Sequence, residues 1–99
     1  GDKANTPMFS NTSEKYAVLN KRTGLVKQIT VYGSGDHGRE KLKDIDTDHR
    51  RKNKVSGRIF EPEDIHVHDY INGKRSTEAR DPSPAEKRLL MIARYGGKK

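Results

Sequence analysis

The chain has 99 residues, which gives room for a single domain because a second cooperative core would not fit. It has no cysteine, which excludes a disulfide framework and a thiolate metal site, and no apolar run approaches the roughly 20 residues that a membrane span needs. Hydrophobic residues make up 29% of the sequence, and 21 Lys and Arg against 14 Asp and Glu give a net charge of +7. We therefore expect a small core and a phosphate-bearing partner such as nucleic acid.

The first part of the chain predicts a leader followed by a β-hairpin. Residues 1–13 are small and polar and indicate a leader or linker, which leaves residues 14–99 as the folded domain. Because the sequence begins GDKANTP without an initiator Met, we expect it to be a piece of a longer protein or a processed product. Two β-rich runs, residues 15–20 and 25–33, flank a polar stretch that ends at Gly24, which is the pattern of a hairpin.

The middle of the chain predicts a continued meander. Residues 33–38 (GSGDHG) form a second glycine-rich turn, and residues 39–49 that follow suit either a short helix or a third strand. We favour the strand, because it continues the hairpin as a meander. Residues 50–58 predict a basic loop, residues 65–71 (IHVHDYI) a clear strand, and residues 72–83 a polar connection.

The last element is a predicted helix. Ser83 is suited to the N-cap, Pro84 to the first helical position and Glu86 to the third, and Gly96 is placed to end the helix. Its predicted apolar stripe consists of Ala85, Leu89, Ile92 and Ala93. A hairpin, a meander and one helix predict an α+β domain, in which the C-terminal helix packs on a small antiparallel sheet.

The strand IHVHDY is the most informative segment for chemistry. Alternate side chains of a strand point to opposite faces, so Ile65 and Val67 anchor one face to the core. The opposite face then presents His66, His68 and Tyr70 in a row. We expect the two imidazoles to point away from the core and toward a basic groove.

Three interpretations of this histidine pair remain open on the residues alone. With Asp46 or His49, the pair can hold Zn²⁺ or the metal of a nuclease. Without a metal, two imidazoles can supply the base and the acid that cleave RNA, while Lys and Arg neutralise the phosphate. The third interpretation is a half-exposed strand face on which the histidines have no activity.

The order of motifs resembles the C-terminal toxin domains of bacterial polymorphic and contact-dependent growth inhibition systems, nearest to those with an H-V-H-(D/E)-Y motif after a tyrosine-rich hairpin. The resemblance covers roughly residues 16–72, and its most specific parts are residues 44–46 (DID), His49 and residues 66–70 (HVHDY). The sequence departs from that pattern at Ile65, where those domains usually carry Pro.

The resemblance implies a nuclease effector that is delivered into a neighbouring bacterium. It implies cleavage of RNA, most often tRNA, and a cognate immunity protein that protects the producing cell. Some relatives also recruit a translation elongation factor of the target cell. The chain would then be the C-terminal part of a larger secreted or cell-surface toxin and would act in the cytoplasm of the target.

We accordingly predict a metal-independent endoribonuclease without a cofactor. His68 and His66 are the expected acid and base, Asp46 and His49 support or share that role, and Tyr70 orients a histidine or stacks on a base. The residues expected to bind phosphate are Arg39, Arg51, Lys54 and Lys43. We expect the immunity protein to be acidic. The alternatives are a metal-dependent DNase that uses the same histidines and a non-catalytic RNA-binding module.

Overall fold

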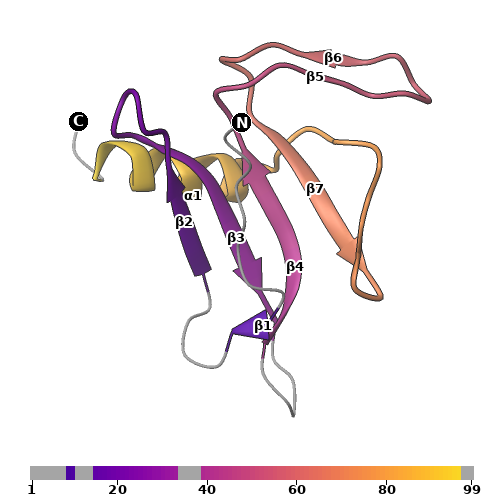
Figure 1. The fold of residues 1–99 in the computed structure, drawn as a ribbon, viewed down its shortest axis with the longest axis horizontal. Coiled ribbons are helices and arrows are strands. Elements are labelled where there is room, and N and C mark those ends of the chain that lie inside the picture. The colour runs from indigo at the N-terminus through magenta and orange to yellow at the C-terminus, as the bar shows by residue number, and fades with distance from the viewer. Residues whose placement is uncertain (1–8, 11–14, 34–38, 97–99) are drawn as a thin grey trace.

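A computed structural model describes residues 9–10, 15–33 and 39–96 of the chain. Its strands are β1 (Phe9–Ser10), β2 (Lys15–Leu19), β3 (Val26–Tyr32), β4 (Arg39–Asp46), β5 (Arg51–Lys52), β6 (Ile59–Phe60), β7 (His66–Ile71) and β8 (Lys74–Arg75), and the helix α1 (Pro84–Tyr95) follows them. Strands β2-β3-β4-β7-β8 form an antiparallel sheet in that order, and α1 packs on one of its faces (Figure 1). The predicted α+β class is confirmed. In the part of the chain that is described, no helix combines the length and the apolar character needed to cross a membrane.

The predicted hairpin and meander form the first half of the sheet. Ala17 of β2 lies opposite Ile29 of β3, and Ile29 in turn lies opposite Ile45 of β4. Of the two alternatives for residues 39–49, the strand is therefore confirmed over the helix, and it runs from Arg39 to Asp46.

Two predictions fall on segments that the structure describes only in part. Beyond Gly33, the predicted turn at residues 33–38 lies outside the described residues. Of the predicted leader, residues 1–13, the structure describes Phe9 and Ser10, which pair with the start of β4.

The hydrophobic core lies between the sheet and the helix. Ile29, Ile45 and Val67 come from the three neighbouring strands β3, β4 and β7, and they meet Leu90 of α1. Ile45, Val67 and Leu90 are fully buried. Burying a side chain of this size contributes about 1.5–3 kcal/mol, so these few contacts hold the helix to the sheet.

The helix begins and ends where the sequence predicts. The Ser83 hydroxyl accepts a hydrogen bond from the backbone N–H of Glu86 at 3.1 Å, and the Glu86 carboxylate accepts one from the backbone N–H of Ser83 at 2.8 Å. This capping box satisfies two N–H groups that the first turn leaves without a partner. Gly96 ends the helix in the left-handed conformation, with φ of 64°.

The predicted apolar stripe of the helix is confirmed in part. Leu89 and Ala93 pack against the core, whereas Ala85 and Ile92 are exposed. The side that faces the sheet also includes Leu90 and Glu86, which are buried. Glu86 can be buried there because it accepts hydrogen bonds from Arg80 at 2.8 and 2.9 Å.

Two predicted loops contain strands. The basic loop of residues 50–58 is part of a hairpin, in which Arg51 lies opposite Phe60. The polar connection of residues 72–83 begins with a tight turn that joins β7 to β8, and Asn72 and Gly73 both have positive φ, of 52° and 78°. Asn-Gly is the sequence most typical of such a turn, so the signal was present in the sequence and was missed.

Candidate active site

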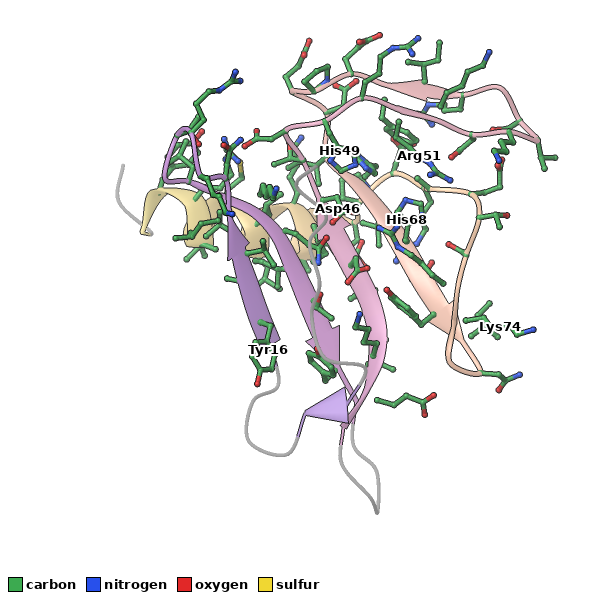
Figure 2. The ribbon with its side chains drawn as sticks, in the orientation of Figure 1. Tyr16, Asp46, His49, Arg51, His68 and Lys74 are labelled. Atoms are coloured by element: carbon green, nitrogen blue, oxygen red, sulfur yellow. The ribbon has the colours of Figure 1, made fainter. Side chains whose placement is uncertain are left out.

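The candidate site lies on the sheet face that points away from α1. In the pairing of β4 with β7, Asp46 lies opposite His66 and Asp44 lies opposite His68. Figure 2 shows Asp46 and His68 on these strands, with His49 and Arg51 gathered beside them near the β5–β6 hairpin. We refer to Asp44, Asp46, His49, His66 and His68 as the His–Asp cluster.

The alternation of side chains along β7 was predicted correctly, but the prediction that the two imidazoles line an open groove is wrong. His66 is 0% exposed and His68 is 1% exposed, so neither imidazole lies at a groove or on a half-exposed face. The ring of Phe60 from β6 lies 5.3 Å from the ring of His66, and the carbonyl of Ser76 accepts a hydrogen bond from Nδ1 of His68 at 3.0 Å. The β5–β6 hairpin and the segment after β8 therefore cover this face.

His49 is the member of the cluster that reaches solvent. Its Nδ1 lies 3.2 Å from the carbonyl oxygen of Thr47, and because a carbonyl only accepts, Nδ1 carries the hydrogen. The lone pair of His49 is then on Nε2, which lies 3.1 Å from Nε2 of His66. The same nitrogen of His66 lies 4.0 Å from Oδ2 of Asp46. Asp46, His66 and His49 thus form a row from the buried strand to the surface.

Arg75 of β8 closes the row on its other side. Its Nη2 lies 2.9 Å from Oδ2 of Asp46, and its Nε lies 3.3 Å from Oδ2 of Asp44. Arg75 was not among the site residues predicted from the sequence. The Asn-Gly turn was the signal that could have found it, because the turn places Arg75 opposite Tyr70 and on the histidine face.

Burial sets the protonation of the cluster. It raises the pKa of Asp46 to about 7, with the neighbouring charge of Asp44 acting in the same direction and Arg75 opposing both. Burial also lowers the pKa of His66 and of His68 to about 4, so both imidazoles are neutral at pH 7. The pKa of His49 is lowered for the same reason.

Asp44 has a structural environment that is fully hydrogen-bonded. One oxygen accepts a hydrogen bond from the Thr30 hydroxyl at 2.7 Å, and the other accepts one from the Tyr70 hydroxyl at 2.8 Å. Burial and this hydrogen bond raise the pKa of Tyr70 above its usual value. Tyr70 therefore holds Asp44 in place, and the contact with a histidine that we expected is not made.

Asp46 differs from Asp44 because one of its oxygens has no partner. Within the described residues, three buried side-chain atoms have no hydrogen bond: Oδ1 of Asp46, Nε of Arg51 and Nδ1 of His66. The guanidinium of Arg51 does donate through Nη2 to the carbonyl of Thr77. Buried polar atoms of folded proteins nearly always have a partner, so an unsatisfied carboxylate oxygen marks a place where water, a cation or a substrate can bind.

The four predicted phosphate-binding residues are not brought together. Arg51 lies in the site, whereas Lys54 lies in the turn of the β5–β6 hairpin. Lys43 lies on the helix face, because it has the same strand parity as Ile45, and its Nζ donates to Glu86 at 2.7 Å. For Arg39 the structure describes the backbone, within β4.

Comparison with protein families, with curated proteins and with solved structures found no match to this chain.

Proposed function

We propose that this chain is a metal-independent endoribonuclease. The observation that carries the proposal is the row formed by Asp46, His66 and His49, which ends in an exposed imidazole, with Arg75 bonded to Asp46 and Arg51 beside His49 (Figure 2). RNA supplies its own nucleophile, the 2′-hydroxyl, so cleavage needs proton transfer and charge neutralisation rather than an activated water. The row of Asp46, His66 and His49 can transfer the proton, and the two arginines can neutralise the charge of the phosphate.

In this proposal His49 is the group that exchanges a proton with RNA, because it is the exposed imidazole of the cluster. The Thr47 carbonyl fixes the hydrogen on Nδ1 and directs the basic Nε2 inward, where His66 faces it. A bound 2′-hydroxyl replaces His66 as the partner of Nε2, gives up its proton there and attacks the adjacent phosphorus. The bond between that phosphorus and the 5′ oxygen breaks, and the 5′ oxygen leaves with a proton from solvent. His66 and Asp46 are positioning residues that hold the His49 ring and set its basicity.

The toxin role belongs to the same proposal. The motif resemblance and the net charge of +7 support an effector that cleaves RNA, most plainly tRNA, in the cytoplasm of a target bacterium. They also support neutralisation by an acidic immunity protein. Opposite charges on the two proteins speed their association, and the attraction between them is stronger at low salt. Recruitment of a translation elongation factor of the target cell is a further part of this proposal.

The test is to incubate the purified chain with tRNA in the presence of EDTA and to sequence the RNA ends. We expect fragments that carry 2′,3′-cyclic phosphates. His49→Ala should lower the rate by about 10²–10⁴, the usual effect of losing a general base, while the exposed control Lys87→Ala should cleave normally. A gel shift without shortened RNA would assign the chain to RNA-binding modules. Cleavage of DNA that depends on added metal would assign it to metal-dependent DNases.

A further inference from the structure

The three side chains of the proposed proton-transfer row also have the arrangement of a transition-metal site. One atom each from Asp46, His49 and His66 lie within 4.8 Å of one another. In a tetrahedral zinc site with Zn–N bonds of about 2.0–2.1 Å, two histidine nitrogens lie about 3.3 Å apart. The Nε2 atoms of His49 and His66 are 3.1 Å apart, which is close to that separation, and the rings must turn so that both lone pairs point at one ion. Oδ2 of Asp46 is 4.0 Å from His66 and must move inward to join them.

A second observation points to a ligand at the same place. The Asp46 side chain is 1% exposed, yet its Oδ1 has no hydrogen-bond partner in the described part of the chain. Leaving a buried carboxylate oxygen unsatisfied is costly, and a cation that the carboxylate binds through Oδ1 as well as Oδ2 removes that cost. Asp44, which is buried to a similar degree, shows the contrast, because both of its oxygens are hydrogen-bonded.

The hydrogen bonds behind the histidine also suit metal binding. Histidine ligands of metals usually donate their second N–H to a carbonyl or carboxylate, which fixes the ring and leaves the other nitrogen free to coordinate. His49 does so through Nδ1 to the Thr47 carbonyl, and its Nε2 is directed at His66.

The positive charges of Arg51 and Arg75 repel a cation at this site, and the repulsion from Arg75 can be relieved. Arg75 is bonded to Asp46, but its side chain is 42% exposed and can turn into solvent when a metal takes its place. Two imidazoles and one carboxylate form a donor set that suits Zn²⁺ better than Mg²⁺ or Ca²⁺, which prefer oxygen ligands.

We propose that Asp46, His49 and His66 bind Zn²⁺, and that zinc silences the ribonuclease. The second half rests on the proposed function: the metal occupies the Nε2 lone pair of His49, which is the same lone pair that must accept the proton of the 2′-hydroxyl. Zinc binding and RNA cleavage are therefore mutually exclusive at this site.

The metal half is tested without RNA, by titrating ZnCl₂ into the EDTA-treated, dialysed full chain in a calorimeter and by measuring Tm. We expect one Zn²⁺ per chain and a higher Tm. His49→Ala, at an exposed position, and Asp46→Asn, which keeps the shape of the side chain, should each weaken binding by roughly 10-fold or more. His37→Ala, a histidine outside the set, should bind zinc as the unmodified chain does. Zinc binding that survives both site variants, or that is lost in the His37 variant, would overturn the assignment.

The silencing half is tested by measuring tRNA cleavage in EDTA and again with one equivalent of Zn²⁺. We expect cleavage in EDTA and its loss with zinc, with recovery when the chelator is returned. Cleavage that appears only with zinc would overturn the silencing and make the metal a catalyst. If RNA stays intact under both conditions while calorimetry shows one bound Zn²⁺, the proposed function fails and the metal site stands. If cleavage proceeds and no zinc binds, the metal site fails and the proposed function stands.

Discussion

Replacing His68 by alanine is expected to destabilise the fold substantially, although the residue lies on the face of the sheet opposite the hydrophobic core. His68 is 1% exposed, and its Nδ1 donates to the carbonyl of Ser76 at 3.0 Å. A buried group left without its hydrogen-bond partner costs about 1–3 kcal/mol. The space left by the imidazole adds about 1–2 kcal/mol, the lower range for cavities in cores. The sum is about 2–5 kcal/mol, which for a chain of this length lowers Tm by roughly 8–40 °C.

A thermal melt followed by circular dichroism measures this effect, with two variants for comparison. Val67→Ala removes a fully buried side chain from the opposite face and should cost about 1–3 kcal/mol. His49→Ala leaves no buried cavity but removes the hydrogen-bond partner of buried His66, so it should cost about 1–3 kcal/mol while losing RNA cleavage. If His68→Ala melted within about 4 °C of the unmodified chain, the argument from burial and hydrogen bonding would be wrong.

Three further substitutions test the electrostatics and the cover of the site. Glu86→Gln weakens the contacts with Arg80 and should cost about 2 kcal/mol in urea unfolding at pH 7. The pKa of Glu86 is held well below its usual value of 4.5, mainly by Arg80, so this difference should shrink progressively as the pH falls below about 4.5; a difference that stays constant down to about pH 2 would contradict the assignment. The pKa of Asp46 is raised from 3.8 to about 7 in the folded state. Between these two pH values the folded chain binds a proton that the unfolded chain does not, so the free energy of unfolding falls as the pH rises from about 4 to about 7. Asp46→Asn should therefore gain stability relative to the unmodified chain between about pH 4 and pH 7, and parallel pH profiles would refute the shift. Asn53→Ala removes two reciprocal hydrogen bonds with Ala79, of 2.8 and 2.9 Å, and should cost about 2–3 kcal/mol and speed amide hydrogen exchange in the β5–β6 hairpin; unchanged exchange would mean that Asn53 does not hold it.

The parts of the fold that follow local rules could be read from the sequence. The helix ends were predictable because Ser83, Glu86 and Gly96 act on the backbone within one turn. The buried side of the helix was predictable only in part, because Glu86 is counted as a solvated charge in any hydropathy pattern. Glu86 is buried here with two cationic partners, Arg80 and Lys43, which are distant from it along the chain or in another element.

The candidate site shows the same division between local and distant information. Alternation within β7 correctly placed His66 and His68 on one face. Their burial could not be read in this way, because the cover consists of segments that the sequence presents as polar loops. His49 and His66 are 17 residues apart along the chain, and their contact depends on the pairing of β4 with β7.

The segment between β8 and α1 joins two parts of the molecule that the sheet keeps separate. Ala79 is hydrogen-bonded to Asn53 in the hairpin that covers the His–Asp cluster. Its neighbour Arg80 is bonded to Asp69 and to Glu86 at the start of α1. A molecule that lifts the hairpin must therefore also strain the attachment of the helix. Opening of the site is expected to be a cooperative event with a free energy close to that of unfolding the helix contact, rather than the fluctuation of a surface loop.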